Sequence, residues 1–458
     1  MGPVESVIMV LGPDALGRRV LVSVASLSLA GFTVGQAAAA PARPVLRFLS
    51  LPATSSALTE GSVAVEPGNP SHLAVLAVDY DGYVVTVPVS GEGTRIGPIC
   101  RLFESRDGGQ HWVTSEYPMQ HLPDAPYLDA SNPSLAISRG GRLHATCLPN
   151  NSVAGGAITY ASAQAGQRLT AMTFPLSTPA VGPVGQPDKP WITVAPNGQD
   201  VTVAWTLFPT NPGYALKIVS RTSRDGGASF GAPAVVSPVT ADAASLPTPL
   251  YTRDGQLVVA WHQTKLDPNG ATSTDSVQVS VNAGAPVTVL PSIAPSGVQD
   301  RYPRHTNQPS LAQDPLTGRL YLTAGEQTAG GVRSVVAFSD DGTHWSPPQI
   351  IAPTPAGDDQ LNAALAVTPG GTVGLLQQDV RNNVLTTWLN TRTRTRNAWT
   401  RILLSRRPTL TVPYTQANNG TPIGDYLTMA ASSGQLLPVW PEGLSGRLQL
   451  RMAAARVA

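Results

Sequence analysis

Pairs of short apolar segments, each pair joined by a glycine-containing turn, recur along the chain. The regular turns are Gly140-Gly141, Asn197-Gly198, Asp254-Gly255, Thr317-Gly318, Gly370-Gly371 and Ser433-Gly434, and a looser copy turns at Gly68-Asn69. Such dipeptides between apolar runs are typical of β-hairpins. The second glycines of the regular turns lie 57, 57, 63, 53 and 63 residues apart. This regular spacing indicates repeated supersecondary units that stack on one another.

A second series, with the pattern Ser-x-Asp-x-Gly-x-x-aromatic, falls between the hairpins. The matching residues are Ser105, Asp107, Gly109 and Trp112, then Ser223, Asp225, Gly227 and Phe230, then Asp340, Gly342 and Trp345, with Phe338 in place of the first Ser. Asp accepts hydrogen bonds from backbone N–H groups in tight turns, and Gly adopts positive φ without strain. We therefore interpret the three Asp residues as structural rather than catalytic.

Weaker copies fill the gaps between these three. Asn282 and Gly284 keep the Asp and Gly positions of one copy, and only the aromatic residue survives at Phe174 and Trp399. The final positions of the six copies are 112, 174, 230, 287, 345 and 399, at intervals of 62, 56, 57, 58 and 54 residues. Each unit is thus predicted to run strand A, glycine turn, strand B, strand C, pattern, strand D. In the second unit the strands are predicted at Pro133–Ser138, Arg142–Leu148, Ala157–Ser162 and Phe174–Ser177.

The last unit lacks a strand D. Its first three strands are predicted at Tyr426–Ala431, Gln435–Trp440 and Arg447–Met452, after which the chain stops. We expect Pro44–Leu51 to supply the missing strand and to close a ring that has no exposed edge. The prediction is an all-β protein, a single β-propeller with seven four-stranded blades, closed by the N-terminal strand. The alternative is a six-bladed ring with the first unit as an irregular extension.

The eight-residue pattern resembles the Asp box, or bacterial neuraminidase repeat, of sialidases and other β-propellers. The resemblance to this superfamily covers nearly the whole chain after the N-terminal segment. It implies that each box joins the two outer strands of a blade. In a propeller, the D-to-A and B-to-C connections share one face, which is usually the functional one.

Composition supports an exported all-β protein. The 43 Gly and 43 Pro favour turns over long helices, and the unbroken period favours one ring over the two or three domains that 458 residues could hold. With 30 basic and 29 acidic residues, and no basic patch interleaved with aromatics, nucleic acid is not an expected partner. A cluster of Arg392, Arg394, Arg396 and Arg401 is interpreted as a solvated strand face.

The N-terminus reads as an export signal. Arg18-Arg19 precede an apolar run from Val20 to Val34, and the small residues Ala37–Ala40 follow. This is the order of a secretory signal peptide with an Ala-x-Ala cleavage site. We expect residues 1–40 to be removed, no membrane span to remain, and residues 41–458 to be secreted or held at the cell envelope as a monomer.

Export permits a disulfide between the only two cysteines, Cys100 and Cys147. They fall at one end of the predicted ring in neighbouring blades. Two buried, unpaired cysteines are the alternative.

Polar and aromatic residues gather where the strands meet the functional face. Before the A strands come Asn132, Asp188, Lys189, Arg304, His305, Asn307, Gln360, Asn362, Asp425 and Tyr426. After the B strands come Asp79, Asp81, Trp205, Trp261, His262, Gln263, Glu326, Gln327, Asp379, Arg381, Trp440 and Glu442. Ligand pockets combine apolar walls with a few placed polar groups. The ligand-binding candidates are Trp261, His262, Trp440, Asp425, Asn307 and Asp79; the alternative is ordinary packing, with each Trp between blades.

Resemblance to sialidases also implies catalytic residues. Those enzymes use a Tyr nucleophile, a Glu that activates it, an Asp acid and three Arg that bind the substrate carboxylate. Tyr426 could be the nucleophile, Glu326 or Glu442 its activator, Asp79 or Asp188 the acid, and Arg304 and Arg381 two of the three carboxylate ligands. No third Arg is found, and Arg95-Ile96-Gly97-Pro98 only partly matches the family's Arg-Ile-Pro motif.

Three interpretations remain from the sequence. The first is an exported propeller that binds a glycan or an envelope protein, because Asp188-Lys189-Pro190-Trp191 and Gly424-Asp425-Tyr426 resemble segments of Asp-box proteins that are not proven sialidases. The second is an exo-acting glycoside hydrolase of sialidase type. The third is an interaction propeller without a small-molecule pocket. No cofactor is expected, and no dense acidic loop requires calcium.

Overall fold

The chain divides into two units, Met1–Ala42 and Arg43–Ala458, and the strands described below all belong to the second. The computed structural model describes residues 44–52, 57–80, 84–86, 93–95, 97–118, 129–151, 155–172, 176, 185–209, 216–238, 242–266, 273–295, 297–299, 302–351, 358–381, 384–395, 398–408, 424–444 and 447–457. These residues form strands and turns without any helix. The predicted signal peptide lies outside them.

The first four blades follow one another along the chain. Blade 1 holds β2 (Leu58–Glu66), β3 (Asn69–Asp79), β6 (Ile99–Ser105) and β7 (Val113–Glu116), and blade 2 holds β8 (Asp129–Ile137), β9 (Leu143–Asn151), β11 (Thr159–Ala163) and β12 (Thr170–Ala171), with β10 (Gly155–Gly156) beside β9. Blade 3 holds β13 (Gln186–Val194), β14 (Val201–Phe208), β15 (Lys217–Ser223) and β16 (Ala234–Val235). Blade 4 holds β17 (Ala243–Tyr251), β18 (Leu257–Leu266), β19 (Ser273–Val281) and β20 (Val287–Leu290).

The remaining blades continue the pattern. Blade 5 holds β23 (Ser310–Gln313), β24 (Leu320–Thr328), β25 (Gly331–Ser339) and β26 (Gln349–Ile350), and blade 6 holds β27 (Asp359–Val367), β28 (Val373–Arg381), β29 (Val384–Arg392) and β30 (Thr400–Pro408). Blade 7 holds β31 (Thr428–Ser432), β32 (Gln435–Leu444), β33 (Arg447–Arg456) and β1 (Val45–Leu49). Two small hairpins lie outside the blades, β4 (Val84–Thr86) with β5 (Gly93–Arg95) and β21 (Gly297–Gln299) with β22 (Tyr302–His305).

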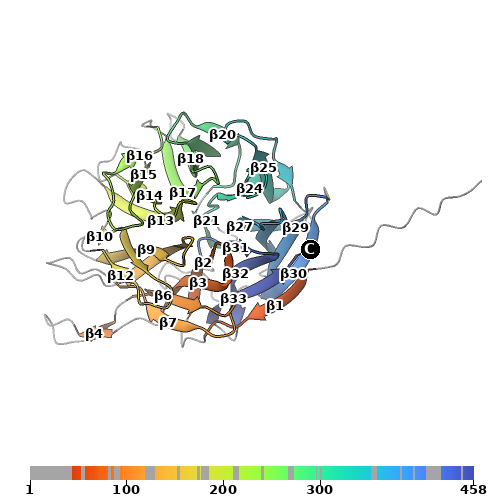
Figure 1. The fold of residues 1–458 in the computed structure, drawn as a ribbon. Coiled ribbons are helices and arrows are strands. Elements are labelled where there is room, and N and C mark those ends of the chain that lie inside the picture. Colours follow the sequence, from red (N-terminus) through yellow and green to blue (C-terminus); the bar gives the residue numbers. More distant parts are fainter. Residues whose placement is uncertain are drawn as a thin grey trace, which may run out of the picture. The chain divides into compact units, whose positions relative to one another are not determined.

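The N-terminal strand closes the ring. β1 pairs antiparallel with β33, from Val45 opposite Arg456 to Leu49 opposite Met452. Figure 1 shows the red-orange β1 beside the dark blue C-terminal strands. The prediction of seven four-stranded blades with this closure is therefore confirmed, and the six-bladed alternative is wrong.

The predicted strand boundaries agree best with the observed ones for the inner strands of a blade. The predicted inner strand Pro133–Ser138 lies largely within β8, and Arg142–Leu148 largely within β9. Among the described residues the outer strand of blade 2 is β12, at Thr170–Ala171, and most of the predicted strand Phe174–Ser177 lies outside them. Of that predicted segment only Leu176 is described, and its N–H donates to the carbonyl of Ile158 at 2.7 Å. The outermost strand therefore begins earlier than the aromatic position of the pattern suggests.

Apolar side chains of facing sheets form the core. Leu76 and Leu102 of blade 1 pack with Leu135 and Leu143 of blade 2, and each further junction has a similar cluster. Burial at these junctions is the main force that holds neighbouring sheets together. At the first junction Cys100 and Cys147 are joined by a disulfide, with their Cα atoms 6.9 Å apart.

The Ser-x-Asp-x-Gly-x-x-aromatic pattern forms tight turns held by their own side chains. Ser105 Oγ donates to Asp107 Oδ1 at 2.9 Å, and the N–H groups of Gln110 and His111 donate to the same carboxylate. Gly109 N–H donates to Ser105 Oγ at 2.8 Å, with φ at 84°. The turn from Ser223 to Phe230 repeats this geometry. These Asp residues satisfy backbone donors, as the structural interpretation requires.

The third turn differs from the predicted alignment by one position. Ser339 Oγ donates to Asp341 Oδ1, and Asp341 accepts the N–H groups of Thr343 and His344. Asp341 therefore holds the turn, and the role predicted for Asp340 was wrong. The reason is a turn one residue shorter, in which Asp341 directly precedes Gly342. Asp340 instead accepts both Nε and Nη2 of Arg319, at 2.7 and 2.8 Å.

Candidate functional site

The starts of the inner strands share an unusual backbone conformation. Non-glycine residues with positive φ occur there in six blades: Glu60, Asn132, Lys189, Leu246, Asn307 and Asn362. In five of these blades the pairing with the next strand shifts at that point. A bulge of this kind re-aims side chains and often lies beside a functional site. Here it turns polar groups of successive blades toward one another.

These polar groups meet in a buried cluster that we call the hub: Glu60, Asn132, Asp188, Lys189, Asp425 and Tyr426. Lys189 Nζ donates to Asn132 Oδ1 at 2.6 Å and forms an ion pair with Asp425. Asn132 donates from its backbone to Glu60 at 3.2 Å and from its side chain to Asp188 at 3.2 Å. The hub thereby links blades 1, 2, 3 and 7.

Tyr426 lies near the carboxylates of this cluster and is only 6% exposed. Its hydroxyl donates to the carbonyl of Pro133 at 2.8 Å, and its ring meets that of Trp191 edge to face, with centroids 5.1 Å apart. Burial, followed by the charges of Glu60, Asp425 and Asp188, raises the pKa of Tyr426 well above its usual value. The phenol therefore stays protonated, and its proton is directed at an acceptor that cannot remove it.

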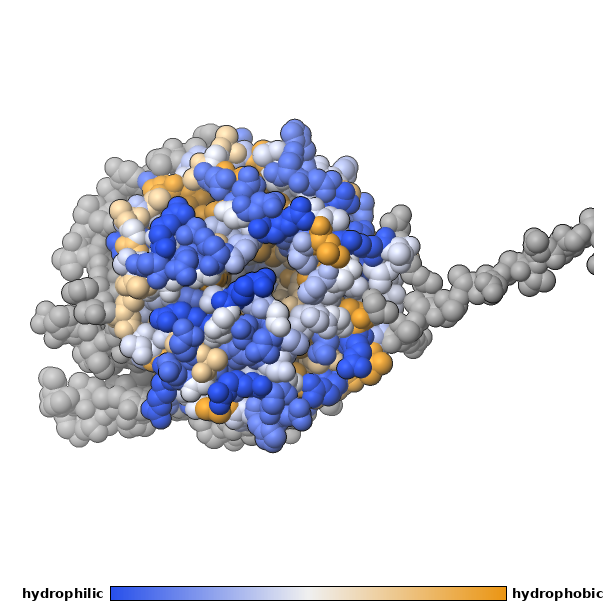
Figure 2. All heavy atoms as spheres, in the orientation of Figure 1, coloured by the Kyte–Doolittle hydropathy of each residue, from blue (hydrophilic) through white to orange (hydrophobic). Residues whose placement is uncertain are grey.

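The axis of the ring offers little space beside this pair. A cavity of about 20 Å³ is lined by Trp191, Tyr426 and Leu427 together with residues of blades 5 and 6. A single water needs roughly 10–15 Å³ of such space. The face of the ring seen in Figure 2 is mainly hydrophilic and hollowed near its middle, but the cavity that the described residues form beside Tyr426 is too small for a sugar.

The other catalytic candidates do not surround Tyr426. The carboxylates that act on it include Asp188 but not Glu326 or Glu442; Glu326 lies on β24, where burial raises its pKa, and Glu442 pairs with Arg451 at 3.1 Å. Arg381 lies on β28 and pairs with Asp358 at 3.2 Å. Arg304 lies on β22, and its side chain is outside the described residues. Glu60 joins the hub unpredicted, because β2 begins at Leu58 and not at Ser62.

The ligand-binding candidates are mostly built into the framework. Trp261 and Trp440 are 0% exposed and pack between blades, so they present no surface to a ligand. His262 Nε2 pairs with Asp275 at 2.7 Å, and Asp79 pairs with Arg101. Asn307 donates to the carbonyls of Ala294 and Gly325 at 2.7 and 2.9 Å, and Asp425 belongs to the hub. Their surroundings are those of ordinary packing within and between blades, which was the alternative to ligand binding.

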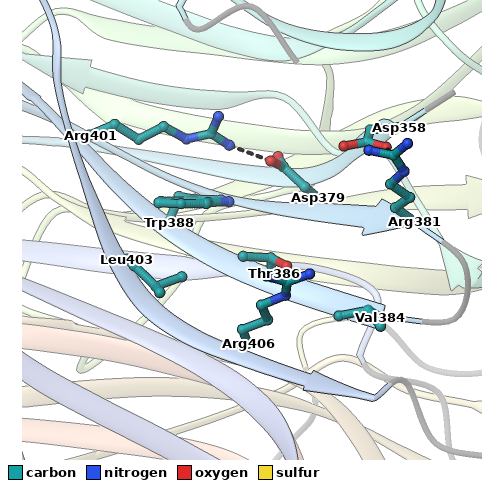
Figure 3. Close-up of a pocket in the computed structure, with 9 residues that line it drawn as sticks. All are labelled: Asp358, Asp379, Arg381, Val384, Thr386, Trp388, Arg401, Leu403 and Arg406. Carbon is teal, nitrogen blue, oxygen red and sulfur yellow. Dashed lines mark hydrogen bonds and ion pairs between the residues drawn. The ribbon is translucent and has the colours of Figure 1, made fainter. Parts of the chain in front are cut away.

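An open groove lies instead on one face of blade 6. Its volume is about 470 Å³, and its lining residues are Asp358, Asp379, Arg381, Val384, Thr386, Trp388, Arg401, Leu403 and Arg406. Strand register places Asp379 opposite Thr386 and Thr386 opposite Arg406, with Trp388 opposite Leu403 in the next row. We call this surface the blade-6 groove (Figure 3).

The groove exists because blade 5 covers only part of this sheet. The inner half of the same face carries Leu365 and Leu375, which pack against Ala312 and Val336 of blade 5. The outer strand of blade 5, β26, has only two residues. The described part of blade 5 therefore covers less of the sheet at β29 and β30, where side chains that alternate toward this face line the groove.

Hydrogen-bond donors outnumber free acceptors in the groove. Arg401 stacks on Trp388, with Cζ 4.1 Å from the ring centroid, and pairs with Asp379. Trp388 Nε1 and Arg401 Nε are nonetheless buried without a hydrogen-bond partner, as is one acceptor of the groove, Asp358 Oδ1. Sequence reasoning missed Trp388, Leu403 and Arg406, and it interpreted Arg401 as part of a solvated face.

The described residues offer neither a metal site nor a membrane-spanning helix. They contain no group of three or more His, Cys, Asp or Glu side chains placed to hold a metal ion. Nor do they contain a helix of the length and apolarity needed to cross a membrane.

Comparisons with known proteins identify the fold. No protein-family model matches the chain, and no curated protein sequence does. An ulvan lyase of polysaccharide lyase family PL25 is similar in structure, with a TM-score of 0.50 at 12% identity, over 88% of this chain and 94% of that one. An α-L-arabinofuranosidase from Fusarium graminearum, solved with an iminosugar inhibitor, has a TM-score of 0.47 at 12% identity, over 78% and 98% of the two chains. An α-L-arabinanase from Penicillium chrysogenum, complexed with arabinobiose, has a TM-score of 0.48 at 14% identity, over 74% and 94%. These neighbours are carbohydrate-active enzymes, and at such identities the likeness concerns the fold.

Proposed function

We propose that this protein is an exported Asp-box propeller of the sialidase-like superfamily that binds a glycan in the blade-6 groove. The observation that carries the proposal is one open groove in which guanidinium groups lie beside an indole and an apolar side chain. Ligand pockets of roughly 300–1,000 Å³ combine apolar contact with a few oriented polar groups in this way. The known ulvan lyase with a similar fold acts on a polysaccharide, which agrees with this class of ligand.

A glycan suits the groove better than a protein partner does. Its apolar contacts, Val384, Leu403 and the Trp388 indole, alternate with guanidinium groups and do not form one apolar patch. A sugar ring has the same alternation, with C–H groups on its faces and oxygens at its rim. Arg381 and Val384 lie where β28 ends and β29 begins, so the groove opens at the B-to-C face that the sequence predicts to be functional.

Binding is favoured over hydrolysis of sialidase type. A nucleophilic Tyr needs an accessible oxygen and a base that takes its proton. Tyr426 is buried, its acceptor is a backbone carbonyl, and the neighbouring carboxylates oppose its ionisation. Arg381, one of the proposed carboxylate ligands, lines the groove rather than the cavity beside Tyr426.

The test is a glycan array followed by calorimetry with the exported protein. We expect Trp388→Ala to lower the affinity for the best glycan by about tenfold or more, since about 1.4 kcal/mol corresponds to a factor of ten. Trp399→Ala is the matched control, because Trp399 is in the same blade but outside the groove and packs against the junction with blade 5. Equal binding by both variants, or no glycan bound by the wild type, would contradict the proposal.

Export is the remaining part of the proposal. It rests on the order of basic, apolar and small residues before Pro41, which lies outside the described residues. Fractionation of cells that express the full chain should recover a protein shortened by about forty residues outside the cytoplasm. Full-length protein confined to the cytoplasm would contradict this part without affecting the binding test.

A further inference from the structure

We infer that the sugar bound in the blade-6 groove is anionic, with a carboxylate or a sulfate ester held by Arg406. The inference rests on the proposed function and adds the chemical class of the ligand. Three guanidinium groups line the groove against two carboxylates, so one positive charge is left over.

The surplus charge belongs to Arg406. Arg401 pairs with Asp379, and Arg381 pairs with Asp358 at 3.2 Å. Arg406 is exposed, and no hydrogen bond or ion pair joins it to another described residue. Figure 3 shows its side chain beside Thr386, which lies opposite it in the strand register.

Both oxygens of Asp379 already have partners other than Arg406. Its Oδ1 accepts Gln377 Nε2 at 2.8 Å, and its Oδ2 accepts Arg401 Nη2. A guanidinium with no paired carboxylate is well suited to an external oxyanion, which it can hold with two parallel hydrogen bonds.

The other free groups also favour a ligand that accepts. Trp388 Nε1 and Arg401 Nε can only donate, and both lack partners. A neutral sugar would bring hydroxyl groups but would leave the guanidinium of Arg406 without a counter-ion. A carboxylate or sulfate brings acceptor oxygens alone and can pair with the exposed guanidinium of Arg406 without leaving protons unpaired.

The apolar side chains of the groove indicate that the anionic group is carried on a sugar ring. Leu403 is 48% exposed and lies opposite Trp388 on the neighbouring strand. An inorganic anion would gain nothing from Leu403 or Val384, while the C–H groups of a sugar ring can cover them and remove apolar surface from water. An anionic sugar uses both kinds of contact.

The experiment measures binding of three oligosaccharide types to the exported protein by calorimetry. Oligogalacturonate carries carboxylates, a κ-carrageenan oligosaccharide carries sulfate esters, and a galactan oligosaccharide is neutral. We expect at least one anionic ligand to bind about tenfold or more tightly than galactan. This binding should weaken as salt rises.

Variants locate the anion within the molecule. Arg406→Gln should reduce anionic binding about tenfold, which is the scale of one charge-assisted contact. Arg139→Gln makes the same charge change at an exposed residue beside the Gly140-Gly141 turn, outside the groove, and should change nothing. Since Arg406 is exposed, the thermal midpoint of its variant should match the wild type.

The outcomes separate the inference from the proposed function. Equal binding of galactan and the anionic ligands, weakened by Trp388→Ala but not by Arg406→Gln, overturns the inference and leaves glycan binding standing. Anionic binding that Arg406→Gln does not change also overturns it. Failure of every glycan overturns both. Binding of only the uronate or only the sulfated ligand supports the inference and identifies the anion.

Discussion

The hub and the blade-6 groove hold similar chemical groups in opposite conditions. In the hub, Lys189 is 5% exposed and is shared by Asn132 and Asp425. In the groove, Arg406 is exposed and Trp388 Nε1 has no partner. Both regions lie at strand ends of the kind that the sequence marks as functional, yet only one leaves hydrogen-bonding capacity for a ligand.

The difference teaches that a polar cluster near the axis of a propeller need not be its binding site. Hub residues form hydrogen bonds or an ion pair with residues of other blades, so removing one side chain leaves a buried charge or dipole without its partner. The groove residues mostly form hydrogen bonds and ion pairs within their own sheet, and the exposed guanidinium of Arg406 is left for a ligand. Hub variants should therefore change stability without changing binding, and groove variants should do the reverse.

The largest expected effect follows from removal of the hub ammonium. Lys189→Met leaves Asp425 buried without its cation, which should lower the free energy of unfolding by about 4 kcal/mol. Urea denaturation measures this loss. The double variant Lys189→Met with Asp425→Asn should recover part of it, since the unpaired charge is then absent. A loss below about 1 kcal/mol would mean that the hub is not a stabilising element.

A second buried charge cluster tests the same principle through pH. His72 lies between Glu66 and Glu104, with each ring nitrogen 3.0 Å from a carboxylate oxygen. Burial alone would lower the pKa of His72, but hydrogen bonds to Glu104 and Glu66 outweigh it and raise the pKa above its ordinary value of 6.5. Burial would raise the pKa of Glu104, but His72 and the N–H of Gly166 lower it below its ordinary value of 4.5.

The sign of the pH dependence follows from these two directions. The stability that protonated His72 contributes to the folded protein is fully present below pH 6.5 and is lost as pH rises through its raised pKa. The contribution of Glu104 is present above pH 4.5 and is lost as pH falls through its lowered pKa. His72→Gln should therefore lower the free energy of unfolding most between pH 4.5 and 6.5, by about 3 kcal/mol, and progressively less at alkaline pH.

Thermal unfolding at several pH values measures the His72 effect. His344→Gln is the control, because the imidazole of His344 is 91% exposed and should contribute little to stability at any pH. A constant difference between wild type and His72→Gln from pH 5 to 9 would contradict the titration argument.

A smaller effect is expected at the aromatic centre of the hub. Tyr426→Phe removes one buried hydrogen bond to the Pro133 carbonyl and should cost about 1 kcal/mol. Calorimetric affinity for the glycan should stay the same, because Tyr426 does not line the groove. Hydrolysis of a fluorogenic sialoside by the wild type, abolished in this variant, would restore the sialidase alternative.

Much of the fold could be predicted because inner strands are specified locally. Paired apolar runs and a glycine turn fix each A–B hairpin, and the missing outer strand of the last unit pointed to β1. Outer strands were harder to place, since β12, β16 and β26 have two residues each and bury little. The alignment of the third box failed because Asp340 and Asp341 are adjacent and only the hydrogen bonds distinguish them.

The candidate site was predicted less well, for a physical reason. Asn132, Lys189 and Asp425 were correctly predicted to lie close together, because each comes at the start of an inner strand. The sequence cannot show that Lys189 forms a hydrogen bond with Asn132 and an ion pair with Asp425. Trp388 lies on strand C, and its accessibility depends on how far the neighbouring blade extends. That dependence links β26 to β29 across separate sheets, so no pattern within one segment reveals it.

The smallest expected effect distinguishes paired from unpaired guanidinium groups within the groove. The side chain of Arg381 is 54% exposed and already pairs with Asp358. Arg381→Gln should change the free energy of unfolding by less than about 0.5 kcal/mol, as is usual for an exposed ion pair. It should also weaken anionic binding less than Arg406→Gln does, because its charge is partly neutralised before the ligand arrives. Parallel calorimetry of the two variants measures this order, and the reverse order would assign the anion to Arg381.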